Sequence, residues 1–212
     1  MFFNPKLKLK LIKDVNERRS IQSIMNILDN SFGFNYSVSN GHVIEIQLIS
    51  VGLALIPRQF GNFPHLNKIQ VPSNRIKKLR NIDGCQNATI INLSGNQLKS
   101  SALEQMISLT KLISLNLSEN QLESYYELGL LKNLEFLDLS YNNITKIPDC
   151  AFSHLKSLNL SNNPIFELEN LHRYESLVQI RMDNCNLPTK EIDILEEGIE
   201  AIKDYCRDKA LN

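Results

Sequence analysis

Histidine and cysteine, the side chains that most often carry protons, attack substrates or bind metals, are scattered along this sequence. The four histidines (His42, His65, His154 and His172) fall in different parts of the chain, and no two have the H-x-x-x-H spacing of a metal site on one helix face. The sequence also lacks G-x-S-x-G, G-x-G-x-x-G and G-x-x-x-x-G-K-S/T, which serve nucleophilic serines, dinucleotides and phosphates. We therefore expect no catalytic residues, no cofactor and no metal, and predict that the protein is not an enzyme.

The four cysteines are also widely separated. Cys85, Cys150, Cys185 and Cys206 form no C-x-x-C pair, which argues against zinc and against a disulfide framework. Reduced, structural thiols are typical of the cytoplasm. The first residues also lack the apolar core of a signal peptide. We therefore expect a cytoplasmic protein.

Composition excludes two further classes of protein. The 212 residues include 23 basic and 23 acidic side chains, so the net charge is zero, and 42% of the residues are hydrophobic. These values are ordinary for one soluble domain and provide no basic footprint for nucleic acid. No apolar run reaches the ~18 residues of a membrane span. We expect a monomer that binds neither nucleic acid nor the membrane interior.

The dominant pattern is a spacing of leucines that ends in an asparagine. Residues 134–144 read L-x-x-L-x-L-x-x-N-x-L, and the apolar spacings fit neither a helix nor a strand throughout. A short strand around Leu137 and Leu139, entered and left by turns, points all of them one way. Asn142 would then hydrogen-bond, through both its donor and its acceptor, to buried backbone groups where the chain leaves the strand.

Seven copies of this pattern follow one another. Val51 and Cys185 stand at the asparagine position of the first and last copies, and cysteine is a known substitute there. One copy cannot fold alone, because ordering each residue costs about 1–2 kcal/mol and burying each apolar side chain returns only about 1.5–3 kcal/mol. Stacking must supply the rest. The expected structural ladder consists of Asn74, Asn96, Asn120, Asn142, Asn163 and Cys185.

The pattern resembles intracellular leucine-rich-repeat proteins with units of about 22 residues. In each repeat a returning segment leads from one strand to the next. The returning segment in residues 74–82 is similar to those of a phosphatase-regulator subunit, and the one with Ile147-Pro148 is similar to those of the Ras-suppressor class. Residues 196–205 are similar to the end of Roco-type repeats. The resemblance implies an α/β solenoid: a horseshoe with a parallel concave sheet and a convex side of short helices and 3₁₀ turns. Capping boxes at Ser101–Glu104 and Ser124–Glu127 predict two of those helices.

The two ends are expected to cap one structural domain. Residues 1–42 would form a tail, an amphipathic helix over 13–32 and a hairpin turning at Asn40-Gly41. Residues 43–187 would hold the repeats, and 188–212 a C-terminal capping helix with Thr189 as N-cap and a weak point at Gly198.

The concave face is where such a solenoid binds its partners. Its two central columns of side chains are largely polar, which makes the apolar members stand out as candidate anchors. Scattered exposed apolar residues are also common without function, so both interpretations stay open. The favoured function is a non-enzymatic scaffold that docks a folded protein. The family likeness leaves an alternative, a regulatory subunit of a protein phosphatase or small GTPase. The candidate partner-binding residues are Ile90, Phe136, Asp138, Tyr141 and Arg181.

Overall fold

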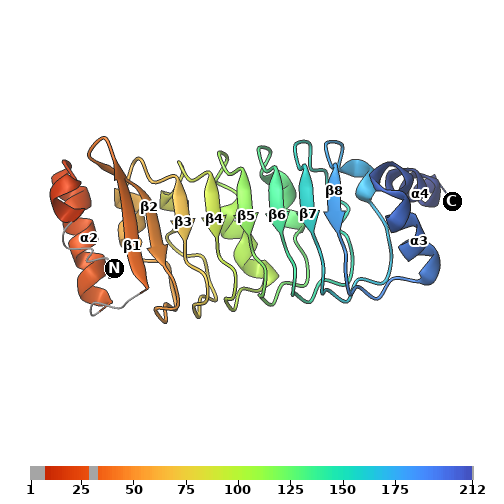
Figure 1. Cartoon of the computed structure of the whole chain (residues 1–212), viewed down its shortest axis with the longest axis horizontal. Coiled ribbons are helices and arrows are strands. Elements are labelled where there is room, and N and C mark those ends of the chain that lie inside the picture. The colour runs from red at the N-terminus through yellow and green to blue at the C-terminus, as the bar shows by residue number, and fades with distance from the viewer. Residues whose placement is uncertain (1–7, 29–32, 212) are drawn as a thin grey trace.

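The chain forms a single curved sheet closed by helices at both ends (Figure 1). The structure is a computed structural model that describes residues 8–28 and 33–211. The eight strands lie in chain order; β1 and β2 are antiparallel, and β2 to β8 are parallel. The strands are β1 (Phe34–Ser39), β2 (His42–Leu48), β3 (Lys68–Gln70), β4 (Ile90–Asn92), β5 (Ser114–Asn116), β6 (Phe136–Asp138), β7 (Ser157–Asn159) and β8 (Gln179–Arg181).

The register of the parallel strands follows the sequence repeat. Leu137 pairs with Leu115 on one side and Leu158 on the other, so equivalent leucines stack across the sheet. All three are buried, whereas Phe136, the neighbour of Leu137 in β6, is exposed on the opposite face. This is the alternation that a strand imposes. The predicted leucine-rich-repeat solenoid with a parallel sheet is confirmed.

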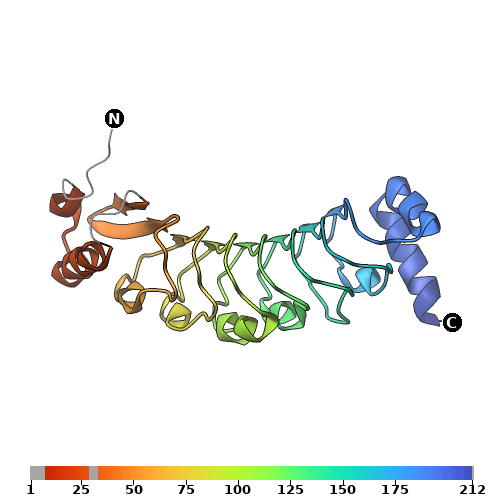
Figure 2. The ribbon, with the colours of Figure 1, turned by 90° about the horizontal axis from the view of Figure 1, so that it is seen from below.

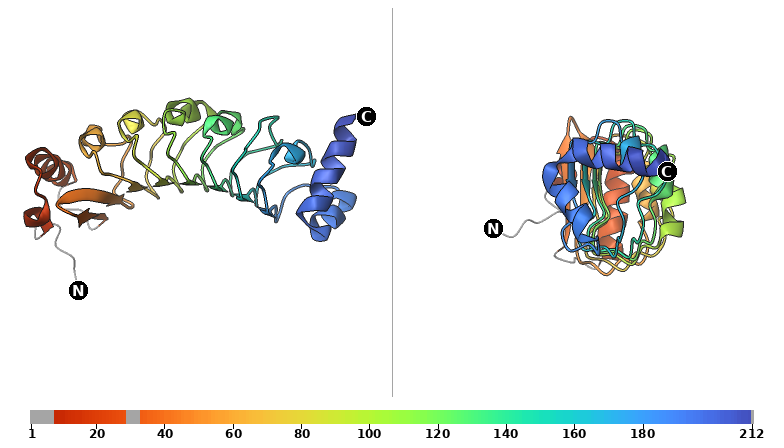
Figure 3. Two further views of the ribbon diagram at one scale, coloured as in Figure 1. Left: turned by 90° about the horizontal axis from the view of Figure 1, so that it is seen from above. Right: turned by 90° about the vertical axis from the view of Figure 1, so that its right-hand side faces the viewer.

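The convex side carries short 3₁₀ helices instead of the α-helices that capping boxes predict (Figures 2 and 3). Short helices lie at both predicted places, but the predicted capping is wrong: η4 begins after Lys99 and η5 after Tyr125, and neither N-cap residue makes a side-chain hydrogen bond. The Ser100 hydroxyl instead accepts hydrogen bonds from the amides of Glu123 and Ser124 in the next repeat. These helices are η2 (Arg58–Asn62), η3 (Ile82–Gly84), η4 (Ser100–Met106), η5 (Tyr126–Leu130) and η6 (Leu171–Arg173).

Buried asparagines connect neighbouring repeats. The side-chain oxygen of Asn120 accepts a hydrogen bond from the amide of Leu98 at 3.0 Å, and its NH₂ group donates to the carbonyls of Leu93 and Leu117. In the last repeat the Cys185 thiol contacts the Leu160 carbonyl at 3.5 Å. Each of these side chains satisfies backbone groups of its own repeat or of the preceding one. Asn74, Asn96, Asn142 and Asn163 make the equivalent contacts.

The N-terminal cap contains the 3₁₀ helix η1 (Leu9–Leu11), helix α2 (Val15–Ile27) and the β1–β2 hairpin. Helix α2 starts two residues later than predicted, because Asp14 is its N-cap and accepts from the Glu17 amide at 2.9 Å. It ends at Ile27, and the rest of the predicted range, 29–32, lies outside the described residues, as does the predicted tail over residues 1–7. The hairpin turns at Asn40-Gly41 as predicted, with φ of 54° and 88°.

The C-terminal cap is two helices rather than the single predicted one. Helix α3 (Thr189–Glu197) ends at Gly198, whose φ of 102° suits glycine, and α4 (Ile199–Leu211) follows directly. The predicted weak point is therefore a complete break. Thr189 is not the N-cap; Pro188 takes that place without a side-chain hydrogen bond.

Buried thiols and phenols give the solenoid a pH dependence at alkaline values. Burial raises the pKa of Cys85 and of Tyr36 to about 12 and that of Cys150 to about 11. A raised folded-state pKa means that the folded chain holds these protons more tightly than the unfolded chain. The corresponding stabilisation is therefore complete below the ordinary thiol pKa, near 9, and is lost as pH rises toward 12.

We expect the melting temperature to fall steadily between pH 9 and pH 12, when followed by circular dichroism. Cys85→Ala should flatten the thiol-dependent part of this fall. A melting temperature that holds constant to pH 12 would contradict the assigned burial.

Candidate functional site

The parallel strands lie along the concave side of the solenoid (Figure 3). The concave face consists of their residues that alternate with the buried ones. Strand pairing aligns two columns of these side chains across the parallel strands. The first column reads Glu45, Lys68, Ile90, Ser114, Phe136, Ser157 and Gln179, and the second reads Gln47, Gln70, Asn92, Asn116, Asp138, Asn159 and Arg181.

A shallow groove crosses the C-terminal half of this face around Phe136. The side chain of Phe136 is 46% exposed, although most large apolar side chains of the repeats are buried. Its neighbours across the sheet, Ser114 and Ser157, are small and leave the aromatic ring accessible. The groove has a volume of about 330 Å³. It is lined by Ser114, Leu115, Asn116, Phe136, Leu137, Asp138, Ser157, Asn159, Gln179 and Arg181.

The structure brings three of the five candidate partner-binding residues together. Phe136, Asp138 and Arg181 line the same groove. Ile90 is 39% exposed on β4, two strands away from Phe136, and does not line the groove. Tyr141 is 58% exposed in the turn after β6, with a φ of 56°, and also lies outside the lining. They remain candidates for the rim of a larger interface.

The second column, which contains Asn116, Asp138 and Asn159, has a structural role that the sequence analysis missed. The Asp138 carboxylate accepts hydrogen bonds from the Ser140 amide at 2.9 Å and the Ser140 hydroxyl at 2.7 Å. The Asn116 and Asn159 side chains accept equivalent bonds from the amides two residues further on. These residues close the turns after β5, β6 and β7. The aspartate or asparagine of the pattern, two residues before a serine, is the signal that predicts this role.

Charges are matched at the N-terminal end of the concave face and unmatched at the C-terminal end. Lys68 lies 2.9 Å from Glu45. Partial burial of Glu45 opposes ionisation, but hydrogen bonds from Gln47, Lys68 and Ser37 hold the pKa of its carboxyl below the ordinary value. Within residues 8–28 and 33–211, Arg181 forms no ion pair and is exposed. The groove therefore contains both an unpaired cation, on β8, and an exposed aromatic ring, on β6.

Two of the four histidines are in contact, although they lie in different repeats as the sequence predicts. The rings of His42 and His65 lie 4.2 Å apart, and His42 Nδ1 is 2.8 Å from a carboxylate oxygen of the buried Glu17. The signal was their separation by one repeat length, which stacks residues side by side. In the described part of the chain no group of three or more His, Cys, Asp or Glu side chains is placed to hold a metal. Over the same ranges, no helix has the length and apolarity that crossing a bilayer requires.

The comparison with known families agrees with this geometry. Residues 132–172, which include the groove residues of β6 and β7, match the model of leucine-rich repeats in two copies. The chain therefore has a leucine-rich-repeat solenoid fold, and its sequence matches the repeat model within this range.

Among curated proteins, the chain is similar to lumican and osteomodulin. Lumican of Mus musculus is 33% identical over 159 residues, which cover 67% of this chain and 47% of that protein. Lumican of Bos taurus is 33% identical over 121 residues, covering 56% and 29%. Osteomodulin of Bos taurus is 29% identical over 130 residues, covering 58% and 31%. In each case the match spans less than half of the relative.

Solved structures share the fold at lower identity. Internalin C2 of Listeria monocytogenes superposes with a TM-score of 0.64 at 23% identity, over 84% of this chain and 77% of that one. A pollen receptor kinase 3 superposes with a TM-score of 0.57 at 22% identity, over 72% and 79%. Identities this low establish the shared solenoid and nothing about the partners.

Proposed function

We propose that this protein is a non-enzymatic scaffold that docks a folded protein on its concave face. The observation that carries the proposal is the exposure of Phe136 in the middle of a polar groove. An aromatic side chain surrounded by polar groups is the usual composition of an interface hot spot, because the ring contributes most of the buried area and the rim excludes water. Ser114 and Ser157 flank the ring and leave space for a partner side chain.

The groove also favours a particular orientation of the partner. Arg181 lies on β8, two strands from Phe136, and is not paired with any acid among the described residues. A carboxylate of the partner would pair with Arg181, since guanidinium groups bind carboxylates through two parallel hydrogen bonds. An apolar side chain of the partner would at the same time cover Phe136.

The proposal includes two further points: that the protein is not an enzyme, and that it is located in the cytoplasm. We propose no catalytic role for Asp138, because its carboxylate accepts hydrogen bonds from Ser140 and closes a turn. Cys85, Cys150 and Cys206 are free and buried, and burial raises the pKa of each thiol. Free thiols suit a reducing compartment, and we place the protein in the cytoplasm on that basis.

Phe136→Ala should reduce capture of the partner from native cell extract at least about tenfold, with little change in the melting temperature, because the ring is exposed in the free protein. The measurement is affinity purification followed by quantitative mass spectrometry. Phe166→Ala is the matched control: Phe166 is equally exposed, at 46%, and lies outside the groove. Equal capture by both variants, or a large loss of stability in Phe136→Ala, would contradict the proposal.

The same purification tests the narrower alternative, a regulatory subunit of a phosphatase or small GTPase, which rests on family likeness alone. Recovery of a phosphatase or GTPase catalytic subunit that depends on Phe136 would favour the regulator. Turnover of a substrate by the purified chain alone would instead favour an enzyme.

A further inference from the structure

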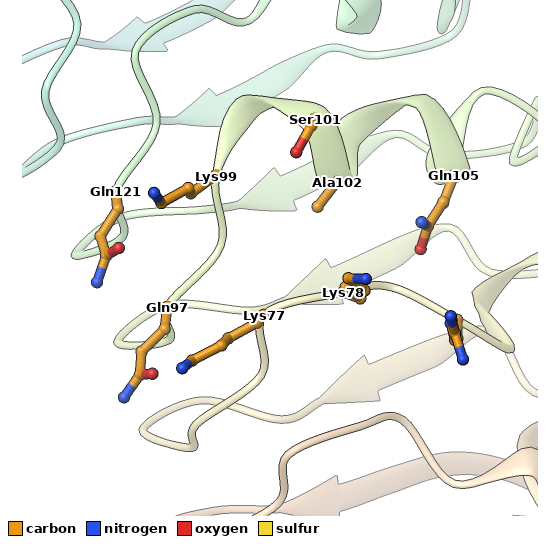
Figure 4. Close-up of a pocket in the computed structure, with 9 residues that line it drawn as sticks. Lys77, Lys78, Gln97, Lys99, Ser101, Ala102, Gln105 and Gln121 are labelled. Carbon is orange, nitrogen blue, oxygen red and sulfur yellow. The ribbon is translucent and has the colours of Figure 1, made fainter.

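A second hollow, which we call the basic groove, lies on the flank formed by the returning segments of the second to fourth repeats (Figure 4). It has a volume of about 710 Å³. In Figure 4, Gln105 extends from η4 toward the segment that carries Lys77 and Lys78. The groove shares no residue with the concave groove around Phe136. Its lining consists of Lys77, Lys78, Arg80, Gln97, Lys99, Ser101, Ala102, Gln105 and Gln121.

The charge of the basic groove is entirely positive. Lys77, Lys78, Arg80 and Lys99 line it, and no acidic side chain does. All four are exposed, and none forms an ion pair with another residue in the part of the chain that the structure describes. The whole chain has zero net charge, so this is a local concentration. Four unpaired cations around one hollow repel one another and attract a multivalent anion.

The neutral side chains of the lining are suited to the same kind of ligand. Gln97, Gln105 and Gln121 each carry an amide that donates two hydrogen bonds and accepts two. The oxygen of Gln105 is buried and accepts no hydrogen bond in the structure. Such an acceptor is unfavourable, and a rotation of the amide toward the groove would let it accept a hydrogen bond from a ligand hydroxyl.

We propose that the basic groove binds a small molecule that carries several phosphate groups and at least one hydroxyl, such as a phosphorylated polyol. Lysine and arginine would pair with the phosphates, and the amide of Gln105 with the hydroxyl. The volume lies within the range of about 300–1,000 Å³ typical of small-molecule sites. A protein partner is less suited, since the only apolar side chain in the lining is Ala102 and no aromatic anchor is present.

The test uses myo-inositol 1,4,5-trisphosphate, which carries both phosphates and free hydroxyls, as probe, titrated calorimetrically into the full chain at about 0.15 M salt, where weak long-range attraction is screened. We expect saturable binding of one probe per chain. The double variant Lys78→Gln/Lys99→Gln should weaken it at least about tenfold, because each lost charge-assisted contact contributes substantially to affinity. Both lysines are exposed, so the melting temperature should not change.

The matched control removes the same charge elsewhere. Lys146 follows the ladder residue Asn142 by four positions, as Lys78 follows Asn74, and Lys10 is exposed in the N-terminal cap. Lys10→Gln/Lys146→Gln should keep affinity within about twofold. Equal weakening by the two double variants would show non-specific attraction and overturn the proposal, as would an absence of saturable binding.

Two further experiments test whether the bound anion is a lipid headgroup or an acidic protein segment rather than a free phosphorylated molecule. Vesicles of phosphatidylcholine, with and without phosphatidylinositol 4,5-bisphosphate, test whether the phosphates belong to a lipid headgroup. Binding only to the second kind, abolished by Lys78→Gln/Lys99→Gln, would support the phosphate chemistry and assign it to a membrane lipid. A decaglutamate peptide that binds more tightly than the inositol phosphate would overturn the proposal in favour of an acidic protein segment.

Discussion

Replacing Glu191 with alanine should lower the free energy of unfolding by about 2–4 kcal/mol. Glu191 is 4% exposed, and its carboxylate accepts hydrogen bonds from the Leu168 amide at 2.7 Å, the Tyr205 hydroxyl at 2.9 Å and the Lys209 ammonium at 3.0 Å. Alanine leaves the Leu168 amide without a partner inside the fold, which is the larger part of the cost. It also removes the hydrogen bonds that join α3 to Tyr205 and Lys209 of α4.

The effect on Lys209 adds to this cost. Partial burial opposes the charged form, but hydrogen bonds to Glu167 and Glu191 raise the pKa of the ammonium above its ordinary value. Glu167 remains a partner at 2.7 Å after the substitution, so the ammonium is not left alone. The total therefore stays below that of a fully buried ion pair.

Urea unfolding followed by circular dichroism measures this difference. Glu196→Ala is the matched control, since Glu196 is an exposed acid on the same helix, and it should change stability by less than about 0.5 kcal/mol. A Glu191→Ala protein as stable as Glu196→Ala would mean that the C-terminal cap does not pack as described.

Asn120→Leu should cost about 1–3 kcal/mol, the value of one buried donor left unpaired. The carbonyls of Leu93 and Leu117 each keep another asparagine as donor, Asn96 and Asn142 respectively. The amide of Leu98 has only the Asn120 oxygen, at 3.0 Å. The loss therefore falls on a single N–H group, and leucine, although similar in size, supplies no acceptor.

The neighbouring substitution Gln121→Ala is the control for this prediction. Gln121 is exposed, and only its backbone amide bonds within the fold, to the Leu98 carbonyl. We expect a change within about 0.5 kcal/mol in the same urea titration. If the two substitutions have equal effects, the asparagine is not a rung that joins the repeats.

The sequence was sufficient to predict the elements that repeat. Residues equivalent to Leu137 and Asn142 occur in successive repeats at nearly constant separation. Repeats of constant length stack with equivalent residues in register, as the strand pairing shows. Register then determined which residues face the concave side, because strand side chains alternate. The exposure of Phe136 followed from its place next to Leu137.

Features that occur once in the chain were predicted less well. The capping boxes at Ser101 and Ser124 have the right residues, but the helices that form there are 3₁₀ helices without side-chain caps, and Ser100 accepts hydrogen bonds from the next repeat instead. The buried acids Glu17 and Glu191, each of which ties a terminal helix to the solenoid, could not be distinguished from surface acids by pattern. Their partners are distant in sequence.

The basic groove was missed for a related reason. Lys77, Lys78 and Arg80 are one short run, but Lys99 and the glutamines come from the following repeats. The basic groove forms only where returning segments of different conformation stack on one another, and the sequence pattern did not determine those conformations. The same stacking brought His42 and His65 together.

The central claim, that a folded partner docks around Phe136, is tested most directly by replacing Phe136 with the photo-crosslinking residue p-benzoylphenylalanine and irradiating native extract. The matched protein carries the same residue in place of Phe166, which is equally exposed outside the groove. The proposed function predicts a covalent adduct with one dominant protein from position 136 and not from position 166. Adducts from position 166 alone, or the same proteins from both, would contradict it.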